Sequence, residues 1–417
     1  MNRKKAMKTS RAVCLAVGVI LGGALNGLGI GVEDIGMSLR RCVEKGNAAG
    51  IVSVITAPDY SMRIDCVGYA DRENKVPMRP DTVFAMFSSS KSVCATAAMI
   101  LISDGRIRLD DPVEKFVPEF ADIRVAVTNA EGKVVRLEPP KRPVTVGDLL
   151  SHRSGARLRP KLVHRDYSLA EAGRLLAREP LGAHPGETFA YNNAAIDVAG
   201  RVIEVAAGMP YERFLEERVF RPLGMKDTTF FPNADQISRL AHCYNGDGRP
   251  LQDQAVGHDD SRAEDRYHCP LQNLLPVSWK TYPAPSAGLY STPLDFARYS
   301  QMLAHHGEWQ GKTIIPRKVF DEVYAVGQCE WKPGMVYAYG NWITGEWFGH
   351  SGAEKTDQRV NLRTGHSRCF FTQIAPPGGK GFERTKETWN AAVDAVQCAE
   401  GATPCRDGST PNLMPGT

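Results

Sequence analysis

Residues 88–105 read SSSKSVCATAAMILISDG. Between Ser90 and Ser103 the side chains are small or apolar on nearly every side, so a helix built from them has no polar face to turn towards water. Gly105 is a typical helix stop. The sequence therefore predicts a buried helix over this stretch, and the rest of the fold must enclose it.

Ser88 and Lys91 form a Ser-x-x-Lys pair at the entry to this helix. A three-residue step places both side chains on one helix face, one turn apart. A serine hydroxyl reacts only when a neighbour takes its proton, and a lysine amine kept from water can do so. Roughly one or two such pairs are expected by chance in a chain of this composition, and a serine cap followed by a solvated lysine is the alternative. Few other charges surround Lys91, which favours a nucleophile and its base.

A Tyr-x-Asn motif, Tyr191 to Asn193, lies on a loop before a helical pattern at 194–207. A phenol near a lysine can share its proton, and an Asn amide can hold a substrate carbonyl. A second copy at 339–341 lies in a strand-like pattern, where packing is the simpler interpretation. The loop copy is therefore the better candidate.

The third motif is Gly349-His350-Ser351-Gly352, at the end of a predicted strand. Small residues there would let a substrate approach the strand edge, although a lone His is more often structural. Other short patterns fail. Residues 349–353 miss G-x-S-x-G at the last position, and 311–313 lack the first glycine of a P-loop. We also expect local structure only at 305–306, 267–269 and 363–365.

The composition is that of an ordinary globular protein. Of 417 residues 42% are hydrophobic and 24% charged, with 39 Gly and 27 Pro, which excludes a disordered, collagen-like or coiled-coil chain. One large domain or two ordinary ones would fit this length. The net charge of +4 comes from five basic residues that precede the first acid, Glu33. We therefore expect no nucleic-acid partner.

The amino terminus has the order of a secretory signal. Basic residues precede an apolar run from Ala12 to Leu25, which extends to Val32 and is then long enough for an uncleaved anchor. We expect residues 1–32 to be a signal peptide or N-terminal anchor, and the protein to be periplasmic or secreted, with membrane association only through this segment. No CxxC pair indicates a zinc or redox site, and Cys94 is expected to be a free thiol in the buried helix.

Periodicity along the chain predicts an antiparallel sheet flanked by terminal helices, together with a mainly helical lobe. Residues 245–273 are polar and are expected to form an exposed loop. Helices are predicted at 35–44, 146–150, 168–178, 194–207, 211–220, 293–305 and 385–398, and strands at 51–55, 61–68, 335–343, 346–350, 358–362 and 367–374.

The three motifs, in this order, resemble those of the serine β-lactamase and penicillin-binding-protein superfamily. The closest likeness is to its class C-like branch, which includes carboxylesterases and D-amino-acid peptidases. The resemblance covers residues 35–395 and implies an α+β, β-lactamase/transpeptidase-like fold, with one catalytic domain at 33–400, a helical lobe at about 110–280 and a tail at 401–417. Five further stretches agree with it: Gly68 to Asp71, Asp81 to Ser88, Leu149 to Gly155, Pro222 to Thr228, and Ala287 to Asp295.

The resemblance also implies roles for the motif residues. Ser88 would be the acylated nucleophile, Lys91 and Tyr191 its proton-transfer partners, and Asn193 a contact to the acyl side of the substrate. The backbone N–H groups of Ser88 and Ala353 would form the oxyanion hole. The strand segment with His350 and Gly352 would line the substrate, whereas His152 is expected to be structural.

Two departures from the family pattern bear on the substrate. His350 stands where penicillin-handling members often carry Lys, so a fixed cation for a substrate carboxylate is missing and an ester is favoured. Residues 353–357 are charged where relatives are glycine-rich. We expect an exported serine hydrolase that acts on a small ester, amide or peptide without metal or organic cofactor. The alternatives are a β-lactamase or D-alanyl-D-alanine carboxypeptidase, and a binding or sensor module without turnover.

Overall fold

The computed structural model describes residues 32–157, 168–244, 282–326 and 328–374, together with residues 383, 386, 387, 389, 390 and 393. Residues 1–31 of the leader predicted at 1–32 lie outside these residues, as do the polar loop at 245–273, which includes Cys269, and the tail at 401–417. None of the described helices is both long and apolar enough to cross a membrane.

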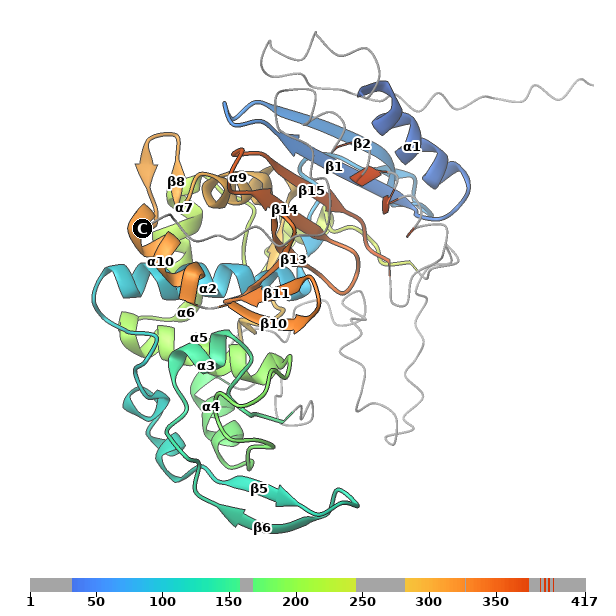
Figure 1. The fold of residues 1–417 in the computed structure, drawn as a ribbon. Coiled ribbons are helices and arrows are strands. Elements are labelled where there is room, and N and C mark those ends of the chain that lie inside the picture. The colour runs from blue at the N-terminus through green and yellow to red at the C-terminus, as the bar shows by residue number, and fades with distance from the viewer. Residues whose placement is uncertain are drawn as a thin grey trace, which may run out of the picture.

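A nine-stranded antiparallel sheet forms the upper part of the molecule in Figure 1. Its strand order is β10-β11-β12-β13-β14-β15-β1-β2-β3, so the amino-terminal strands pair with the last strand of the chain. The bounds are Gly50–Thr56 for β1, Met62–Asp71 for β2, Val76–Pro77 for β3, Gln328–Lys332 for β10, Met335–Ala338 for β11, Asn341–Thr344 for β12, Trp347–Ser351 for β13, Asp357–Asn361 for β14 and Ser367–Phe371 for β15.

Strand β1 is buried on both faces, which explains its nearly unbroken apolar sequence. Val52 and Val54 belong to the main core, whereas Ile51 and Ile55 pack in a second cluster with α1 (Val32–Glu44). Helix α9 (Pro293–Ala304) covers the main-core face of the sheet. The terminal helices predicted at 35–44 and 385–398 thus both contribute to the second cluster, the latter through Trp389 and Val393.

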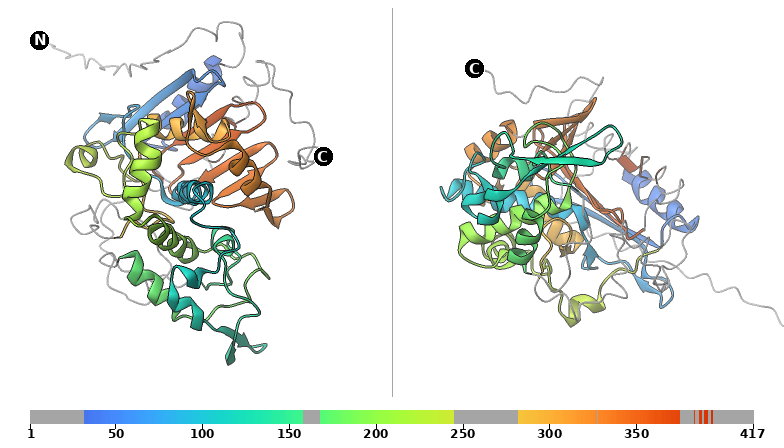
Figure 2. Two further views of the ribbon diagram at one scale, coloured as in Figure 1. Left: turned by 90° about the vertical axis from the view of Figure 1, so that its left-hand side faces the viewer. Right: turned by 90° about the horizontal axis from the view of Figure 1, so that it is seen from below.

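Helix α2 (Ser90–Ser103) coincides with the buried helix predicted from the sequence, and its residues from Ser90 to Leu101 are all buried. Figure 1 and both views of Figure 2 show this helix between the sheet and the helical lobe. Cys94 is a free, fully buried thiol in it. The start of α2 therefore lies where the two parts of the molecule meet.

The lobe below α2 is mainly helical, as predicted, but it also contains an unpredicted hairpin of β5 (Val125–Thr128) and β6 (Val134–Glu138). Its helices are α3 (Val146–Leu150), α4 (Leu169–Ala177), α5 (Asn193–Ala207), α6 (Tyr211–Leu215), α7 (Arg221–Leu223) and α8 (Ala234–Ser238). The remaining α-helix is α10 (Arg317–Val326), and the remaining strands are β4 (Phe84–Ala85), β7 (Tyr290–Ser291), β8 (Glu308–Trp309) and β9 (Lys312–Thr313).

The predicted strand at 335–343 is wrong as a single element, because it is the β11–β12 hairpin. Gly340 has φ +74°, and a Cβ there would lie 2.4 Å from the carbonyl oxygen of Lys91. The turn thus packs against the backbone of α2. In the second Tyr-x-Asn, Asn341 is buried and donates from Nδ2 to the Tyr324 hydroxyl at 3.0 Å, which makes this motif a packing feature.

Candidate active site

Ser88 lies on a short 3-10 turn, η1 (Phe87–Ser89), immediately before α2, and is partly exposed. Lys91 has no exposed surface, and its Nζ lies 2.9 Å from Ser88 Oγ. The same Nζ donates to the carbonyl oxygen of Ser286 at 2.8 Å. The amine is therefore fixed by a backbone acceptor and aimed at the Ser88 hydroxyl.

The turn that carries Ser88 is strained and closely packed. Phe87 has φ +47°, a left-handed conformation that is unfavourable for a bulky residue. Gly352, at the end of β13, packs onto this turn, because a Cβ at Gly352 would lie 2.5 Å from the carbonyl oxygen of Met86. The backbone of the third motif thus lies directly against the nucleophile turn.

Tyr191 lies over the other side of the lysine, with the Lys91 Nζ 4.9 Å from the centre of its ring. A cation or amine at this distance from an aromatic face is attracted by the ring electrons. The structure therefore brings together Ser88, Lys91 and Tyr191, although about a hundred residues separate the first pair from the tyrosine.

The two asparagines after Tyr191 have different positions. Asn192 caps α5, with its Oδ1 accepting from the N–H of Ala195 at 3.2 Å and its Nδ2 donating to the carbonyl of Ala156 at 2.8 Å. Its polar atoms are therefore already bonded. Asn193 is the first residue of α5, and its buried Oδ1 accepts from no group in the described chain. Of the two, Asn193 is the one with an atom left for a substrate.

His152 is a buried histidine that positions the tyrosine loop. Its Nδ1 accepts from the N–H of Asn192 at 3.1 Å, so the proton lies on Nε2, which donates to the Tyr337 hydroxyl at 3.0 Å. Burial, followed by the charge of Lys91, lowers the pKa of His152 well below its usual value. This neutral ring lies 4.5 Å from the Tyr191 ring and holds the backbone N–H of the next residue, Asn192.

His350 lies at the same site with one unsatisfied nitrogen. Its Nδ1 donates to the carbonyl of Ser351 at 2.9 Å, which leaves Nε2 as a bare acceptor. That atom is buried and has no partner among the described residues. Burial and the charge of Lys91 lower the pKa of His350 to about 3, so the ring is neutral at physiological pH. It cannot replace a cation that holds a substrate carboxylate.

The charged residues after Gly352 do not form a charged surface at the site. Ala353 is exposed, whereas Glu354 is buried and accepts a hydrogen bond from the Cys243 side chain. Lys355 pairs with Glu383 at 2.8 Å. The loop therefore directs its ionisable groups into the body of the protein or towards the C-terminal segment, and leaves the Ala353 backbone at the surface.

Two residues of the site carried no signal in the sequence. Ser286 supplies a backbone carbonyl to Lys91, and its own N–H donates to Asp197 Oδ1 at 2.9 Å. Asp197 is buried on α5, and burial raises the pKa of its carboxyl. Asp197 belongs to no motif, and no local pattern marks a backbone carbonyl 195 residues from its partner.

The other short patterns are local structure where they are described. Residues 363–365 lie in the turn between β14 and β15. Gly311 lies in the turn between β8 and β9, and residues 312–313 form β9. His305 bonds the carbonyls of Gln301 and Pro58, and His306 bonds Asp321 and the carbonyl of Leu362. These four ring nitrogens are thus occupied by neighbouring chain.

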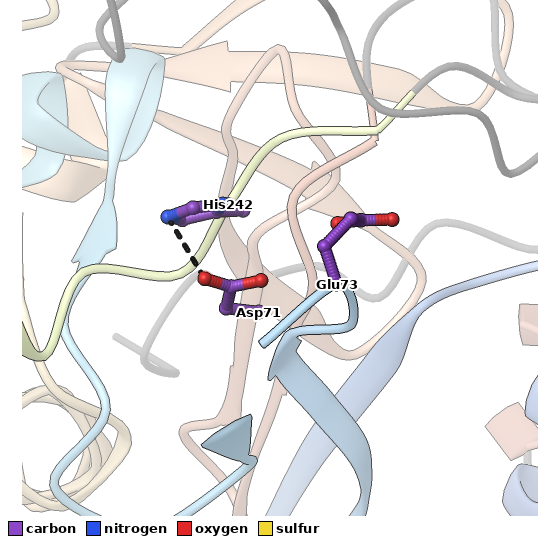
Figure 3. A group of neighbouring side chains, drawn as sticks. All are labelled: Asp71, Glu73 and His242. Atoms are coloured by element: carbon purple, nitrogen blue, oxygen red, sulfur yellow. Dashed lines mark ion pairs between the residues drawn. The ribbon is translucent and has the colours of Figure 1, made fainter. Parts of the chain in front are cut away.

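One group of potential metal ligands exists in the described residues, away from Ser88. The ligand atoms of Asp71, Glu73 and His242 lie within 4.8 Å of one another, and Figure 3 shows His242 facing Asp71. Every carboxylate oxygen of the two acids already accepts from protein donors, as expected for a capped hairpin between β2 and β3. The donors are Asn74 for Asp71, and Tyr244 and Arg72 for Glu73.

A hydroxyl, a buried amine and a phenol at the junction of an antiparallel sheet and a helical lobe define a serine hydrolase of the acyl-transfer type. The family model described as Beta-lactamase matches residues 5–392, so the chain belongs to the Beta-lactamase family. The resemblance inferred from the motifs, the α+β fold and the enzyme class are confirmed.

Relatives of this chain include hydrolases with different substrates. Esterase EstB of Burkholderia gladioli is 28% identical to this chain over an alignment that covers 70% of this chain and 74% of the esterase. The D-alanyl-D-alanine-carboxypeptidase/endopeptidase AmpH of Escherichia coli K12 is 30% identical over an alignment that covers 55% of this chain and 50% of AmpH. Among solved structures, EstCE1, a hydrolase with promiscuous acyltransferase activity, covers 87% of this chain with a TM-score of 0.70 and 23% identity, and 97% of its own length.

Proposed function

We propose that this protein is an exported esterase in which Ser88 is acylated by the substrate. The Ser88 oxygen attacks the ester carbonyl carbon while its proton passes to the Lys91 amine. The tetrahedral intermediate collapses, the C–O bond of the ester breaks, and the leaving alkoxide takes a proton through Tyr191. Water then attacks the acyl-enzyme by the reverse proton path and releases the acid.

The observation that carries this proposal is the 2.9 Å contact between Lys91 Nζ and Ser88 Oγ, made by an amine with no exposed surface. A hydroxyl and an amine in a hydrogen bond of this length can exchange a proton directly. The proposed oxyanion hole, formed by the N–H groups of Ser88 and Ala353, is supported by the packing of Gly352 on the nucleophile turn.

An ester is favoured over a penicillin because the described site has no cation free for a carboxylate. His350 is neutral, and Lys91 is engaged with Ser88 and Ser286. The similarity to the carboxypeptidase AmpH supports a second candidate function, hydrolysis of a D-alanyl peptide or a β-lactam. Both reactions would use the same serine.

Turnover of p-nitrophenyl butyrate and of nitrocefin by the purified protein tests the proposal. We expect ester hydrolysis by the wild type, at least a hundredfold loss in Ser88→Ala, and a kcat/KM for nitrocefin at least tenfold below that for the ester. Ser89→Ala is the matched control, because the adjacent Ser89 hydroxyl is buried and has no described partner. Equal loss in both variants, or faster turnover of nitrocefin, would contradict the esterase assignment.

Export rests on the order of charge and hydrophobicity in residues 1–32. Cell fractionation of the full chain, with the mass of its amino terminus, tests this part separately. A mature protein lacking about the first 25 to 32 residues in the periplasm or medium is expected for a cleaved signal. An intact amino terminus in a membrane pellet indicates the anchor instead, and an intact, soluble cytoplasmic protein contradicts export.

A further inference from the structure

Three partly exposed aromatic side chains, Phe189, Tyr191 and Trp342, form a continuous group beside the Ser88–Lys91 pair, which we call the aromatic wall. Tyr191 and Trp342 are stacked, with ring centres 6.2 Å apart and planes 15° from parallel. Phe189 meets the edge of Trp342 at 6.0 Å. Because the Tyr191 ring also faces Lys91 Nζ, the wall begins at the reacting groups.

Buried rings behind the wall hold it in place. Tyr337 is fully buried, 4.7 Å from the Trp342 ring and 5.7 Å from the Phe189 ring. His152 donates to the Tyr337 hydroxyl and contacts Tyr191 at 4.5 Å. Rings fixed in this way lose little freedom when a ligand packs against them, which favours recognition. The wall is therefore a preformed apolar surface.

Two buried acceptors beside the wall lack a described partner. They are His350 Nε2, with its ring 6.3 Å from Trp342, and Asn193 Oδ1 on the helix that follows Tyr191. A buried acceptor without a donor is unfavourable until a ligand supplies an N–H or O–H. A carboxylate, which can only accept hydrogen bonds, would face the lone pairs of these two acceptors and be repelled.

We propose that the site binds an uncharged ester whose apolar ring or branched hydrocarbon packs on the aromatic wall and whose hydroxyl or amide N–H donates to His350 or Asn193. This proposal rests on the proposed function and specifies its substrate class. Trp342 would therefore determine specificity by packing against the substrate, whereas Ser88 and Lys91 carry out the reaction.

Two series of esters test the wall. In one the acyl group changes from acetyl to phenylacetyl with p-nitrophenol as the common leaving group. In the other acetate is the common acyl group and the alcohol changes from methyl to benzyl. We expect the wild type to prefer the ring-bearing ester in at least one series, and Trp342→Leu to reduce that preference at least tenfold in kcat/KM, mainly through KM.

The matched control is Trp347→Leu, because Trp347 is also a partly exposed tryptophan, on the neighbouring strand, but stacks on Arg368 at 3.9 Å outside the wall. It should leave the preference within twofold of the wild type. An equal effect of both tryptophan variants, or no change in either ester series, would overturn the proposal.

The charge requirement is tested with p-nitrophenyl valerate and the p-nitrophenyl monoester of succinic acid, which has a carboxylate near the position of the valerate chain end. We expect the charged ester to have a kcat/KM at least tenfold lower. Comparable rates for the two esters would contradict the absence of a carboxylate site.

Failure of catalysis can be separated from failure of this inference. In Ser88→Ala, which cannot be acylated, equilibrium binding of the same esters should keep the preference for the ring and lose it in Ser88→Ala/Trp342→Leu. Binding preference without turnover in the wild type would reject the proposed esterase and keep the apolar ligand class. Turnover without any preference would reject the ligand class alone.

Discussion

At the residue scale, the position of the Lys91 amine depends on Asp197, which holds the Ser286 backbone and through it the carbonyl that binds Lys91. Asp197→Ala leaves the buried N–H of Ser286 without its acceptor, at a cost of about 1–3 kcal/mol. We expect a roughly tenfold or larger fall in kcat with little change in KM, because the base rather than the substrate is displaced. Asp197→Asn keeps an oxygen acceptor and should restore most of kcat, whereas equal losses in both variants would indicate general destabilisation.

Glu354 gives a prediction for the pH dependence of stability. Burial raises the pKa of its carboxyl from 4.5 to about 8, and Cys243 is its hydrogen-bond partner. The folded state therefore holds a proton that the unfolded chain releases above pH 4.5, so stability falls as pH rises towards 8 and levels off beyond. Glu354→Gln removes this slope, and should gain on the order of 4 kcal/mol at pH 8 and nothing near pH 4.

Urea unfolding at pH 4, 6 and 8 measures this difference, with the exposed Glu308→Gln as the control. A gain that is the same at pH 4 and pH 8 would mean that the pKa of Glu354 is not raised in the folded protein.

Sequence reasoning foresaw the residues whose partners are local. Ser88 and Lys91 are one helical turn apart, so spacing alone places them together. The carbonyl of Ser286 comes from a distant segment and carries no side-chain signature, so no pattern could indicate it. The burial of Glu354 was also not predicted, because a charged residue in a loop normally has an exposed side chain.

At the scale of elements, the end of β13 is docked onto the η1 turn through Gly352. An added Cβ would lie 2.2 Å from Thr356 Oγ1 and 2.5 Å from the Met86 carbonyl oxygen, and the backbone atom cannot move without displacing Ser88. We expect Gly352→Ala to reduce kcat/KM at least a hundredfold, measured with p-nitrophenyl butyrate and circular dichroism as a check of folding.

Gly173→Ala in α4 is the matched control, since its nearest neighbours are ordinary contacts at 3.5 and 3.7 Å. This change should leave activity intact and stabilise the helix by about 0.5–1 kcal/mol. Full activity in Gly352→Ala would show that the contact between β13 and the turn is not needed.

The elements with strong local patterns were predicted well, and those without were not. Helix α2 was foreseen to the residue, because its composition and its glycine stop agree. The β11–β12 turn was missed, because Tyr339 and Gly340 lie within an apolar run and only the packing of Gly340 on α2 requires the bend. In the β5–β6 hairpin, β6 is exposed and β5 buries only the adjacent Val125 and Ala126, so neither strand has a core-facing alternation to detect.

At the scale of the whole molecule, the two ends of the described chain meet on one face of the sheet. Trp389 is fully buried among residues of α1, β1 and β15, lies 5.0 Å from the Phe370 ring, and donates from Nε1 to Ser53 Oγ at 2.9 Å. Trp389→Ala should cost about 3–5 kcal/mol of unfolding free energy, and Trp389→Phe about 1–2 kcal/mol because it loses mainly the hydrogen bond.

Urea denaturation measures these losses, and specific activity without denaturant serves as the second readout. Because Trp389 lies on the face away from the main core that encloses α2, activity of the folded protein should be retained. A loss below about 1 kcal/mol in Trp389→Ala would mean that the C-terminal segment contributes little to the fold.

The most direct test of the central claim, that the Lys91 amine activates the Ser88 hydroxyl, is the rate of fluorophosphonate labelling followed by intact mass and peptide mapping. We predict one adduct per chain, located on Ser88, that forms at least a hundredfold more slowly in Lys91→Met, a variant of similar volume at a fully buried position. An adduct on another residue, or labelling of Ser88 at the same rate without the lysine, would contradict the account.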